Sequence, residues 1–177
     1  MKRPAIFLDR DGTLVEEVNY LHRPEDMRVF PFTATALNVL KEAGFLLIVV
    51  TNQSGIGRNI YTVEDMNSVH AAFQAEIEGV IDGFYYCPHL PCDGCACRKP
   101  ALKMIEDAVN DLKIDLENSW MVGDKKIDME AGQNAGVKTA LVLTGYGSSH
   151  QATLERLPDV VADDLGAAAQ KIVVLHA

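Results

Sequence analysis

Several features that would assign this chain to a particular class of protein are missing from it. No apolar run reaches the about 18 residues that a membrane-spanning helix needs, so we expect no membrane partner. Positive charge is scarce: 16 lysines and arginines against 25 acidic residues give a formal net charge of -9, which argues against a nucleic-acid-binding surface. Internal repeats, low-complexity tracts and linker-like stretches are also absent. We therefore predict one domain over residues 1–177.

The N-terminal stretch does not look like a secretion signal. Its short apolar run at residues 5–8 is interrupted at once by Asp9. We therefore expect a cytoplasmic protein. In that reducing compartment, clustered cysteines bind metal more often than they form disulfides.

Short apolar runs alternate along the chain with helical patterns. The runs that predict strands are residues 5–8, 45–50, 83–87, 120–123 and 139–143, with a weaker one at 160–162. The patterns that predict helices are residues 33–43, 62–77, 102–112 and 126–135, and a last stretch from residue 165. This alternation predicts an α/β fold, a three-layer Rossmann-like parallel sheet with helices on both faces. Ligands of such sheets bind beyond the carboxyl ends of the strands.

Polar motifs follow four of the predicted strands. They are an acidic pair at residues 9–13, a hydroxyl and amides at residues 51–55, Lys99, and a second acidic pair at residues 123–128. Each motif alone has an ordinary structural explanation, such as a turn or a helix cap. Taken together, the four motifs follow successive predicted strands, and this regular order favours a single site to which all of them contribute.

In that order, the motifs resemble those of the haloacid dehalogenase-like phosphohydrolases, and the resemblance covers nearly the whole chain. It implies that Asp9 attacks phosphorus and forms an aspartyl-phosphate, while Asp11 acts as general acid and then general base. Thr51 and Lys99 would hold phosphoryl oxygens. Mg²⁺ would be bound by the carboxylates of Asp9 and Asp124 and by the backbone carbonyl of Asp11.

Substrate choice in this superfamily usually comes from an inserted cap domain. No inserted stretch of this chain is long enough to form a large cap, so we expect an open site shaped by short loops. Asp128 is expected to orient its neighbours rather than to bind the metal.

All four cysteines and one histidine fall within residues 87–97. Zn²⁺ bound tetrahedrally could order this loop, which has few apolar residues of its own; disulfides are the alternative. The spacing Cys-x-His…Cys-x-Cys-Arg-Lys resembles the zinc loop of D-glycero-D-manno-heptose 1,7-bisphosphate 7-phosphatases. The resemblance implies four ligands, Cys87, His89, Cys95 and Cys97. Cys92 departs from that pattern and could displace Cys95.

Further segments at residues 7–13, 49–56 and 85–89 resemble the same family. The resemblance implies removal of the 7-phosphate from the bisphosphorylated heptose, a step toward nucleotide-activated heptose and lipopolysaccharide core. The residues expected to contact this substrate are Glu17, Val18, Asn19, Tyr20, Thr51, Asn52, Gln53, Ser54, Arg98, Lys99 and Lys125. Glu17 and Asn19 differ from the common pattern, which leaves the preferred anomer open.

Other functions remain open at this point. Histidinol-phosphate phosphatases share the capless core and a similar zinc loop, but their amine-bearing substrate favours acidic groups near the loops. A binding module without activity would have no need of Asp11, and a mutase usually needs a cap. We expect a monomer that acts on a small phosphorylated sugar.

Two further expectations concern residues outside these motifs. Arg10 lies between the first two acids, and strand alternation predicts that it points away from them and serves as an anchor. The remaining histidines are expected to be surface or helix residues rather than ligands: His22, His70, His150 and His176.

Overall fold

The computed structural model describes residues 2–177. Its strands are β1 (Arg3–Leu8), β2 (Leu46–Asn52), β3 (Gly83–Cys87), β4 (Ile114–Gly123), β5 (Lys138–Val142) and β6 (Val160–Ala162). Its helices are the short 3₁₀ turn η1 (Pro24–Asp26), α1 (Thr33–Glu42), α2 (Ser54–Gly57), α3 (Val63–Glu76), α4 (Lys103–Leu112), α5 (Lys126–Ala135), α6 (Gly147–Gln151) and α7 (Leu165–His176).

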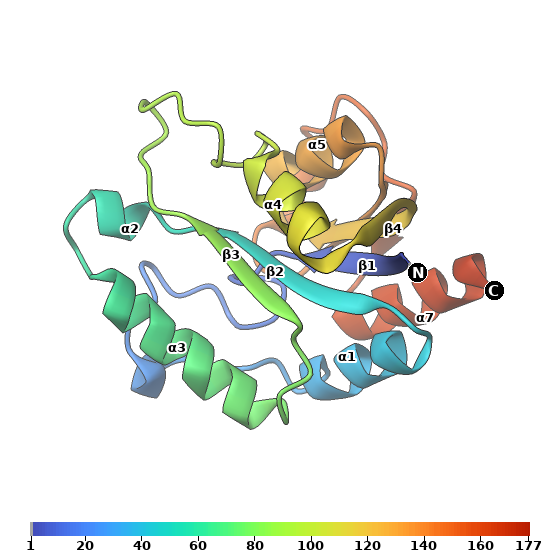
Figure 1. Ribbon diagram of the computed structural model, residues 1–177, viewed down its shortest axis with the longest axis horizontal. Helices are drawn as coiled ribbons and strands as arrows, with labels where there is room; N and C mark the ends of the chain where they lie inside the picture. Colours follow the sequence, from blue (N-terminus) through green and yellow to red (C-terminus); the bar gives the residue numbers. More distant parts are fainter. Residues whose placement is uncertain (1) are drawn as a thin grey trace.

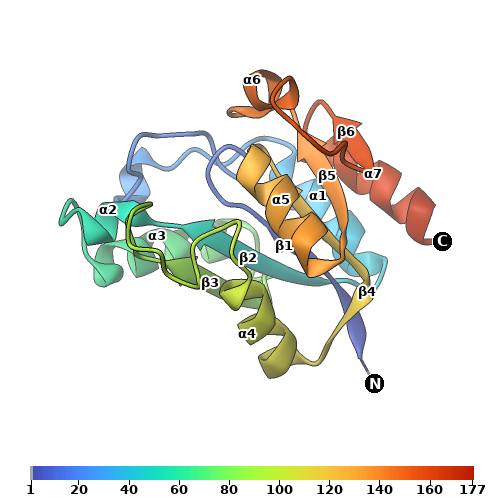
Figure 2. The ribbon, with the colours of Figure 1, turned by 90° about the horizontal axis from the view of Figure 1, so that it is seen from above.

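The six strands form one parallel sheet in the order β3-β2-β1-β4-β5-β6. Helices α4 and α5 cover one face, and α1, α3 and α7 cover the other (Figures 1 and 2). The predicted three-layer α/β fold is confirmed. Within residues 2–177, no inserted segment forms a large cap domain.

Alternation along the central strand assigns its side chains to the two layers. Ile6 and Leu8 of β1 pack in the core with α1, α3 and α7. Ala5 and Phe7 point the other way, into the core beneath α4 and α5. Since both faces are covered, the strand reads as a continuous apolar run rather than as an alternating pattern.

Local signals account for several helix boundaries. Thr62 and Asp65 form a capping box that begins α3, and Gly136, at φ +76°, ends α5 in the left-handed conformation that suits glycine. The largest difference from the predicted elements is β4, which begins at Ile114 rather than at residue 120. Its early part pairs with Arg3 and Pro4 before the register shifts between Pro4 and Ile6, an irregularity that an apolar run does not reveal.

The strand order reverses at β1, because β2 lies on one side of it and β4 on the other. In open parallel sheets such a reversal leaves a crevice beyond the carboxyl ends of the two strands. Here those ends lie on the side where α2 and the loop after β3 project (Figure 1).

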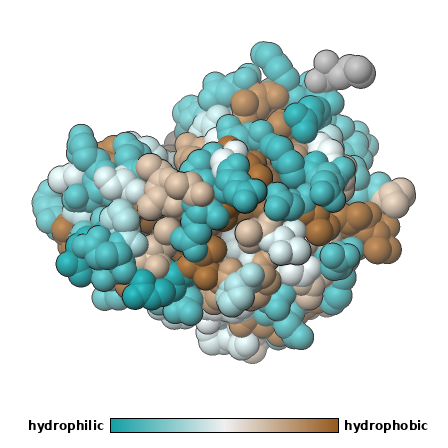
Figure 3. All heavy atoms as spheres, turned by 90° about the horizontal axis from the view of Figure 1, so that it is seen from below, coloured by the Kyte–Doolittle hydropathy of each residue, from teal (hydrophilic) through white to brown (hydrophobic). Residues whose placement is uncertain are grey.

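From the side of α1, α3 and α7, hydrophilic and apolar residues are interspersed over the surface (Figure 3). None of the helices in residues 2–177 combines the length and the hydrophobicity needed to span a bilayer.

Candidate active site

Three buried carboxylates meet in the crevice between β1 and β4. Asp9 follows β1, Asp124 follows β4, and Asp128 lies in the first turn of α5. One oxygen from each lies within 4.8 Å of the others. The structure therefore brings together the two carboxylates predicted to bind Mg²⁺, and adds Asp128 to them.

Lys99 enters this cluster from the loop after β3 and is only 3% exposed. Its Nζ lies 2.8 Å from Asp9 Oδ1, 2.7 Å from Asp128 Oδ1 and 2.8 Å from the Val50 carbonyl oxygen. The contacts with Asp9 and Val50 are hydrogen bonds, and the contact with Asp128 is an ion pair. Burial alone would lower the pKa of Lys99, but the two carboxylates raise it, so the side chain stays charged. Burial would likewise raise the pKa of Asp9, yet the charge of Lys99 holds it below the ordinary value.

The environment of Asp124 fits a divalent cation. Its Oδ2 accepts a hydrogen bond from the Tyr146 backbone N–H at 2.8 Å, whereas its buried Oδ1 has no hydrogen-bond partner. Burial, together with the charges of Asp9 and Asp128, raises the pKa of Asp124 to about 8. A cation would remove that repulsion, and carboxylate oxygens are the ligands that Mg²⁺ prefers.

Asp128 has contacts that suit an orienting role. One of its oxygens pairs with Lys99, and the other accepts the backbone N–H of Lys125 at 3.0 Å. Oδ1 forms only the ion pair and no hydrogen bond, while Oδ2 holds the start of α5, a contact that suits an orienting role.

The carboxylate of Asp11 lies outside the acidic cluster. It pairs with the Arg10 guanidinium at 3.0 Å and accepts a hydrogen bond from Gln53 Nε2 at 3.1 Å. The expectation that Arg10 points away from the acids is wrong, because regular strand geometry stops at Leu8 and the arginine side chain folds back onto Asp11. Magnesium binding through the Asp11 carbonyl stays a prediction.

The end of β2 supplies Thr51 and Asn52. Thr51 is 1% exposed, and its hydroxyl accepts a hydrogen bond from Gln53 Nε2 at 2.8 Å. The side-chain amide of Asn52 holds the backbone of Lys99, accepting its N–H at 2.9 Å and donating to its carbonyl at 3.3 Å. Asn52 therefore fixes the segment that carries the buried lysine.

A pocket of about 260 Å³ opens beside Asp11. Its lining includes nine of the eleven residues predicted to contact substrate: Glu17, Val18, Asn19, Tyr20, Asn52, Gln53, Ser54, Arg98 and Lys125. The other two, Thr51 and Lys99, are buried and do not line it. Lining residues that were not predicted include Leu21, Tyr61 and Ile127.

Three cations and two acids line this pocket: Arg10, Arg98 and Lys125, with Asp11 and Glu17. Arg10 pairs with Asp11, so the other three residues set the remaining charge. Lys125 lies 3.6 Å from Glu17, and burial raises the pKa of Glu17 above its ordinary value. Within residues 2–177, Arg98 forms no ion pair with a carboxylate. Its charge is therefore available to an anion in the pocket.

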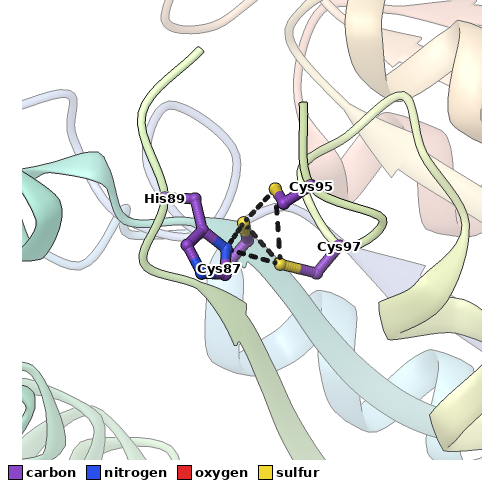
Figure 4. Close-up of side chains that lie close together, drawn as sticks. All are labelled: Cys87, His89, Cys95 and Cys97. Atoms are coloured by element: carbon purple, nitrogen blue, oxygen red, sulfur yellow. Dashed lines mark hydrogen bonds between the residues drawn. The ribbon is translucent and has the colours of Figure 1, made fainter. Parts of the chain in front are cut away.

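The last residue of β3 and the loop after it bring together the four predicted zinc ligands: Cys87, His89, Cys95 and Cys97 (Figure 4). Cys87 Sγ lies 3.5 Å from both His89 Nδ1 and Cys95 Sγ, and His89 Nδ1 lies 3.1 Å from Cys97 Sγ. Three sulfurs and one nitrogen at such spacings suit tetrahedral Zn²⁺ with no open position, which is typical of a structural site.

The fifth candidate ligand, Cys92, lies outside that cluster. It is exposed, its nearest polar partner is Asp93, and all four cysteines are free thiols. The geometry therefore favours Cys95 over Cys92 as the ligand. On the other side of the loop, Arg98 donates to the His89 carbonyl at 3.4 Å and lines the pocket, so the loop joins the cysteine cluster to the site.

The loop after β5 also belongs to the site, although its sequence contains no acid. The Thr144 hydroxyl donates to the Gly12 carbonyl at 2.7 Å, and Tyr146 N–H donates to Asp124. Gly145, at φ +55°, leaves so little room that an added Cβ would lie 2.2 Å from Asp124 Oδ2. The strand-end rule could have pointed here, because β5 ends at the same edge of the sheet.

Replacing Gly145 with alanine should weaken Mg²⁺ binding by about tenfold, because the methyl group must push Asp124 from its place. Mn²⁺ binding followed by electron paramagnetic resonance, and the Mg²⁺ dependence of turnover, would measure this.

Gly136→Ala is the matched control for that variant. It strains a positive φ in the same way but meets no atom within 4 Å. We expect it to cost about 1 kcal/mol of stability and to leave metal affinity unchanged. Equal metal affinity in the two variants would contradict the role given to Gly145.

Comparison with known proteins agrees with this site. A family model described as HAD-hydrolase-like matches residues 96–168. The chain is 39% identical to a D-glycero-D-manno-heptose-1,7-bisphosphate 7-phosphatase of Thermosynechococcus vestitus, over 97% of this chain and 96% of that protein. It is 39% identical to a D-glycero-beta-D-manno-heptose-1,7-bisphosphate 7-phosphatase of Haemophilus ducreyi, over 93% and 96% of the two chains.

Fold and site together define a hydrolase of the haloacid dehalogenase type. The crystal structure of the D,D-heptose 1,7-bisphosphate phosphatase from B. bronchiseptica, complexed with magnesium and phosphate, superposes with a TM-score of 0.89 and 31% identity, covering 97% of this chain and 99% of that one. The chain belongs to the haloacid dehalogenase-like hydrolases, in the family of these heptose bisphosphate phosphatases.

Proposed function

We propose that the protein is a Mg²⁺-dependent phosphatase that removes the 7-phosphate of D-glycero-D-manno-heptose 1,7-bisphosphate. The observation that carries this is the combination of the Asp9–Lys99–Asp124 cluster with a cationic pocket, in a chain about 39% identical over its length to phosphatases of that name. The product, a heptose 1-phosphate, would serve the synthesis of nucleotide-activated heptose.

In the first half of the reaction, an oxygen of Asp9 attacks phosphorus. The new Asp9–phosphorus bond replaces the bond to O7 of the sugar, and Asp11 donates a proton to that departing oxygen. The ionised state of Asp9 needed for this attack is favoured by Lys99, which holds Oδ1 at 2.8 Å and leaves Oδ2 for the phosphorus.

In the second half, water attacks the aspartyl-phosphate. Asp11, now ionised, accepts a proton from that water, and cleavage of the Asp9–phosphorus bond releases inorganic phosphate. Asp9 and Asp124 would hold Mg²⁺, which supplies positive charge to the phosphoryl oxygens when bound. Thr51, the last residue but one of β2, would hold one of those oxygens through its hydroxyl.

The second phosphate of the substrate is expected at Arg98 and Lys125. Both cations line the 260 Å³ pocket that begins at Asp11, and the planar guanidinium of Arg98 matches the geometry of a phosphate group. The loop residues Glu17–Tyr20 would then contact the sugar between the two phosphates.

Histidinol phosphate, the alternative substrate, finds no support among these relatives. Its amine would also enter a pocket in which both acids are already paired, Glu17 with Lys125 and Asp11 with Arg10. The reaction is assigned to the cytoplasm, since a Cys₃His zinc site requires reduced thiolates. We expect the enzyme to act as a monomer, a prediction that rests on the sequence alone.

A substrate panel tests the proposal. Magnesium-loaded enzyme should hydrolyse the heptose bisphosphate at least about a hundredfold more efficiently than histidinol phosphate, since the second phosphate adds two charged contacts. Phosphorus NMR of the product should show the 1-phosphate retained. Comparing the α and β anomers would reveal the preference. A higher kcat/KM for histidinol phosphate would overturn the assignment.

A further inference from the structure

Arg10 is an unusual residue to find fully buried beside an active site. It is 1% exposed, and its only ion pair within residues 2–177 is with Asp11. Its Nε lies 3.1 and 3.2 Å from the two Asp11 oxygens, and Nη2 lies 3.1 Å from Oδ1. A planar fork that meets both oxygens of a carboxylate fixes the plane of that carboxylate as well as its position.

A second contact fixes the same carboxylate from the side of β2. Gln53 Nε2 donates to Asp11 Oδ2 at 3.1 Å and to Thr51. Gln53 Oε1 accepts from Arg10 Nη2 at 3.2 Å and from the Tyr61 hydroxyl. Because the oxygen faces two donors and the nitrogen two acceptors, the orientation of the Gln53 amide is determined by its neighbours.

Arg10 Nη2 also donates to the Leu21 carbonyl at 3.4 Å, and Nη1 meets a histidine from α3. Arg10 Nη1 lies 3.3 Å from His70 Nε2, and His70 is 6% exposed. A guanidinium can only donate, so Nε2 is the acceptor and the ring proton is on Nδ1. Burial and the charge of Arg10 lower the pKa of His70 to about 3, which keeps the ring neutral. The ring stacks on Phe84 of β3 with centroids 4.6 Å apart, which fixes its plane.

His70 does not line the pocket, so it has no direct contact with a substrate bound there. It is nonetheless joined to Asp11 through a single residue. Within residues 2–177, His70 is the only hydrogen-bond acceptor that contacts Arg10 Nη1. Removing the imidazole would therefore leave a buried donor unpaired. Such a loss costs more than the hydrogen bond itself and is relieved most easily by rotation of the guanidinium.

We propose that His70 is a positioning residue for catalysis: by accepting the hydrogen bond of Arg10 Nη1 it fixes the guanidinium, which in turn holds the Asp11 carboxylate in the plane from which it transfers protons. The inference rests on the proposed function, because it takes Asp11 as the acid and base of phosphate hydrolysis. It adds a part of the machinery that comes from α3, outside the four strand-end motifs.

Leaving-group dependence distinguishes this role from a purely structural one. A sugar alkoxide needs a proton as it departs, whereas 4-nitrophenolate does not. In His70→Leu, kcat/KM for the heptose bisphosphate should fall at least about tenfold, a part of the 10²–10⁴-fold that general acid catalysis provides, while kcat/KM for 4-nitrophenyl phosphate falls less than about threefold. His70→Gln, whose Oε1 can replace Nε2 as acceptor, should restore the sugar rate to within about threefold of wild type.

Val69→Ala is the matched control, since it removes buried methyl groups from the neighbouring position of α3 and no hydrogen-bond acceptor. It should lower the melting temperature without changing the ratio of the two rates. If His70→Leu does not fold, His70→Asn replaces it, because its shorter side chain cannot reach Arg10 and the Gln-versus-Asn comparison tests the same contact.

Equal losses on both substrates, no loss on the sugar, or a glutamine variant as slow as leucine would each overturn the inference. A wild-type enzyme that hydrolyses 4-nitrophenyl phosphate but not the heptose bisphosphate would instead overturn the proposed function. The His70 variants would then be judged on an alkyl phosphate that the wild type does hydrolyse.

Discussion

Asp9→Asn is expected to lower kcat on the heptose bisphosphate by about 10⁴-fold or more, because an amide is a far weaker nucleophile than a carboxylate. The variant also loses the anionic partner of Lys99, which lies 2.8 Å away. Phosphate release under saturating substrate would measure the loss. Mass spectrometry of acid-quenched wild-type enzyme should find one added phosphoryl group on the peptide that contains Asp9.

The control for that experiment is Asp163→Asn, which makes the same chemical change at an exposed position. It should leave kcat within about twofold of wild type, as expected of a surface substitution. Retention of turnover within tenfold by Asp9→Asn would show that another residue, or water directly, attacks phosphorus.

Cys97→Ser is expected to lower both the zinc content and the activity of the protein strongly. Zinc content is expected to fall from about one ion per chain to less than about one-tenth, because Ser is a poor ligand in a site with no spare donor, and structural zinc contributes on the order of 10 kcal/mol. Arg98, the next residue, would lose its fixed backbone. Substrate binding would then have to order the Arg98 backbone. This cost should lower kcat/KM roughly tenfold, which corresponds to about 1.4 kcal/mol of activation free energy. Metal analysis and steady-state kinetics measure the two effects.

Cys92→Ser provides the matched comparison within the same loop. Its thiol is exposed and lies outside the cluster of Cys87, His89, Cys95 and Cys97, so zinc content and activity should both remain near wild type. Loss of zinc from Cys92→Ser, with zinc retained by Cys95→Ser, would exchange these two residues in the ligand set.

The sequence predicted the arrangement of the sheet and the residues at its edge well, for a physical reason. Parallel strands end at one edge, so Asp9, Thr51 and Asp124 had to lie at that edge once their strands were recognised. Lys99 follows β3 only after a loop, and its place was predicted from the order of the motifs. The cysteine cluster was predictable because its ligands are close in sequence. Long-range details, such as the early start of β4 at Ile114, depend on pairing that no apolar run reveals.

The part of the site that was not predicted depends on side chains beyond regular structure. The alternation rule failed for Arg10 because that residue follows the end of β1. His70 was expected to be an ordinary surface or helix residue, although it lies four positions after Met66 and three before Phe73, on the buried face of α3. Its position on that face was a signal of burial. Its contact with Arg10, 60 positions earlier in the chain, was not visible in the sequence.

The place of β1 between β2 and β4 has a consequence for how the protein is made. The ribosome synthesises β1 and Asp9 first, whereas Asp124 follows only after more than half of the chain, and α5 with Asp128 comes later still. A nascent chain therefore carries Asp9 for most of its synthesis without the carboxylates that complete the cluster. Non-local pairing of β1 with β4 is also a slow kind of folding event. Hydrolysis should thus begin only when the centre of the sheet has closed, and fragments that end before β4 should be inert.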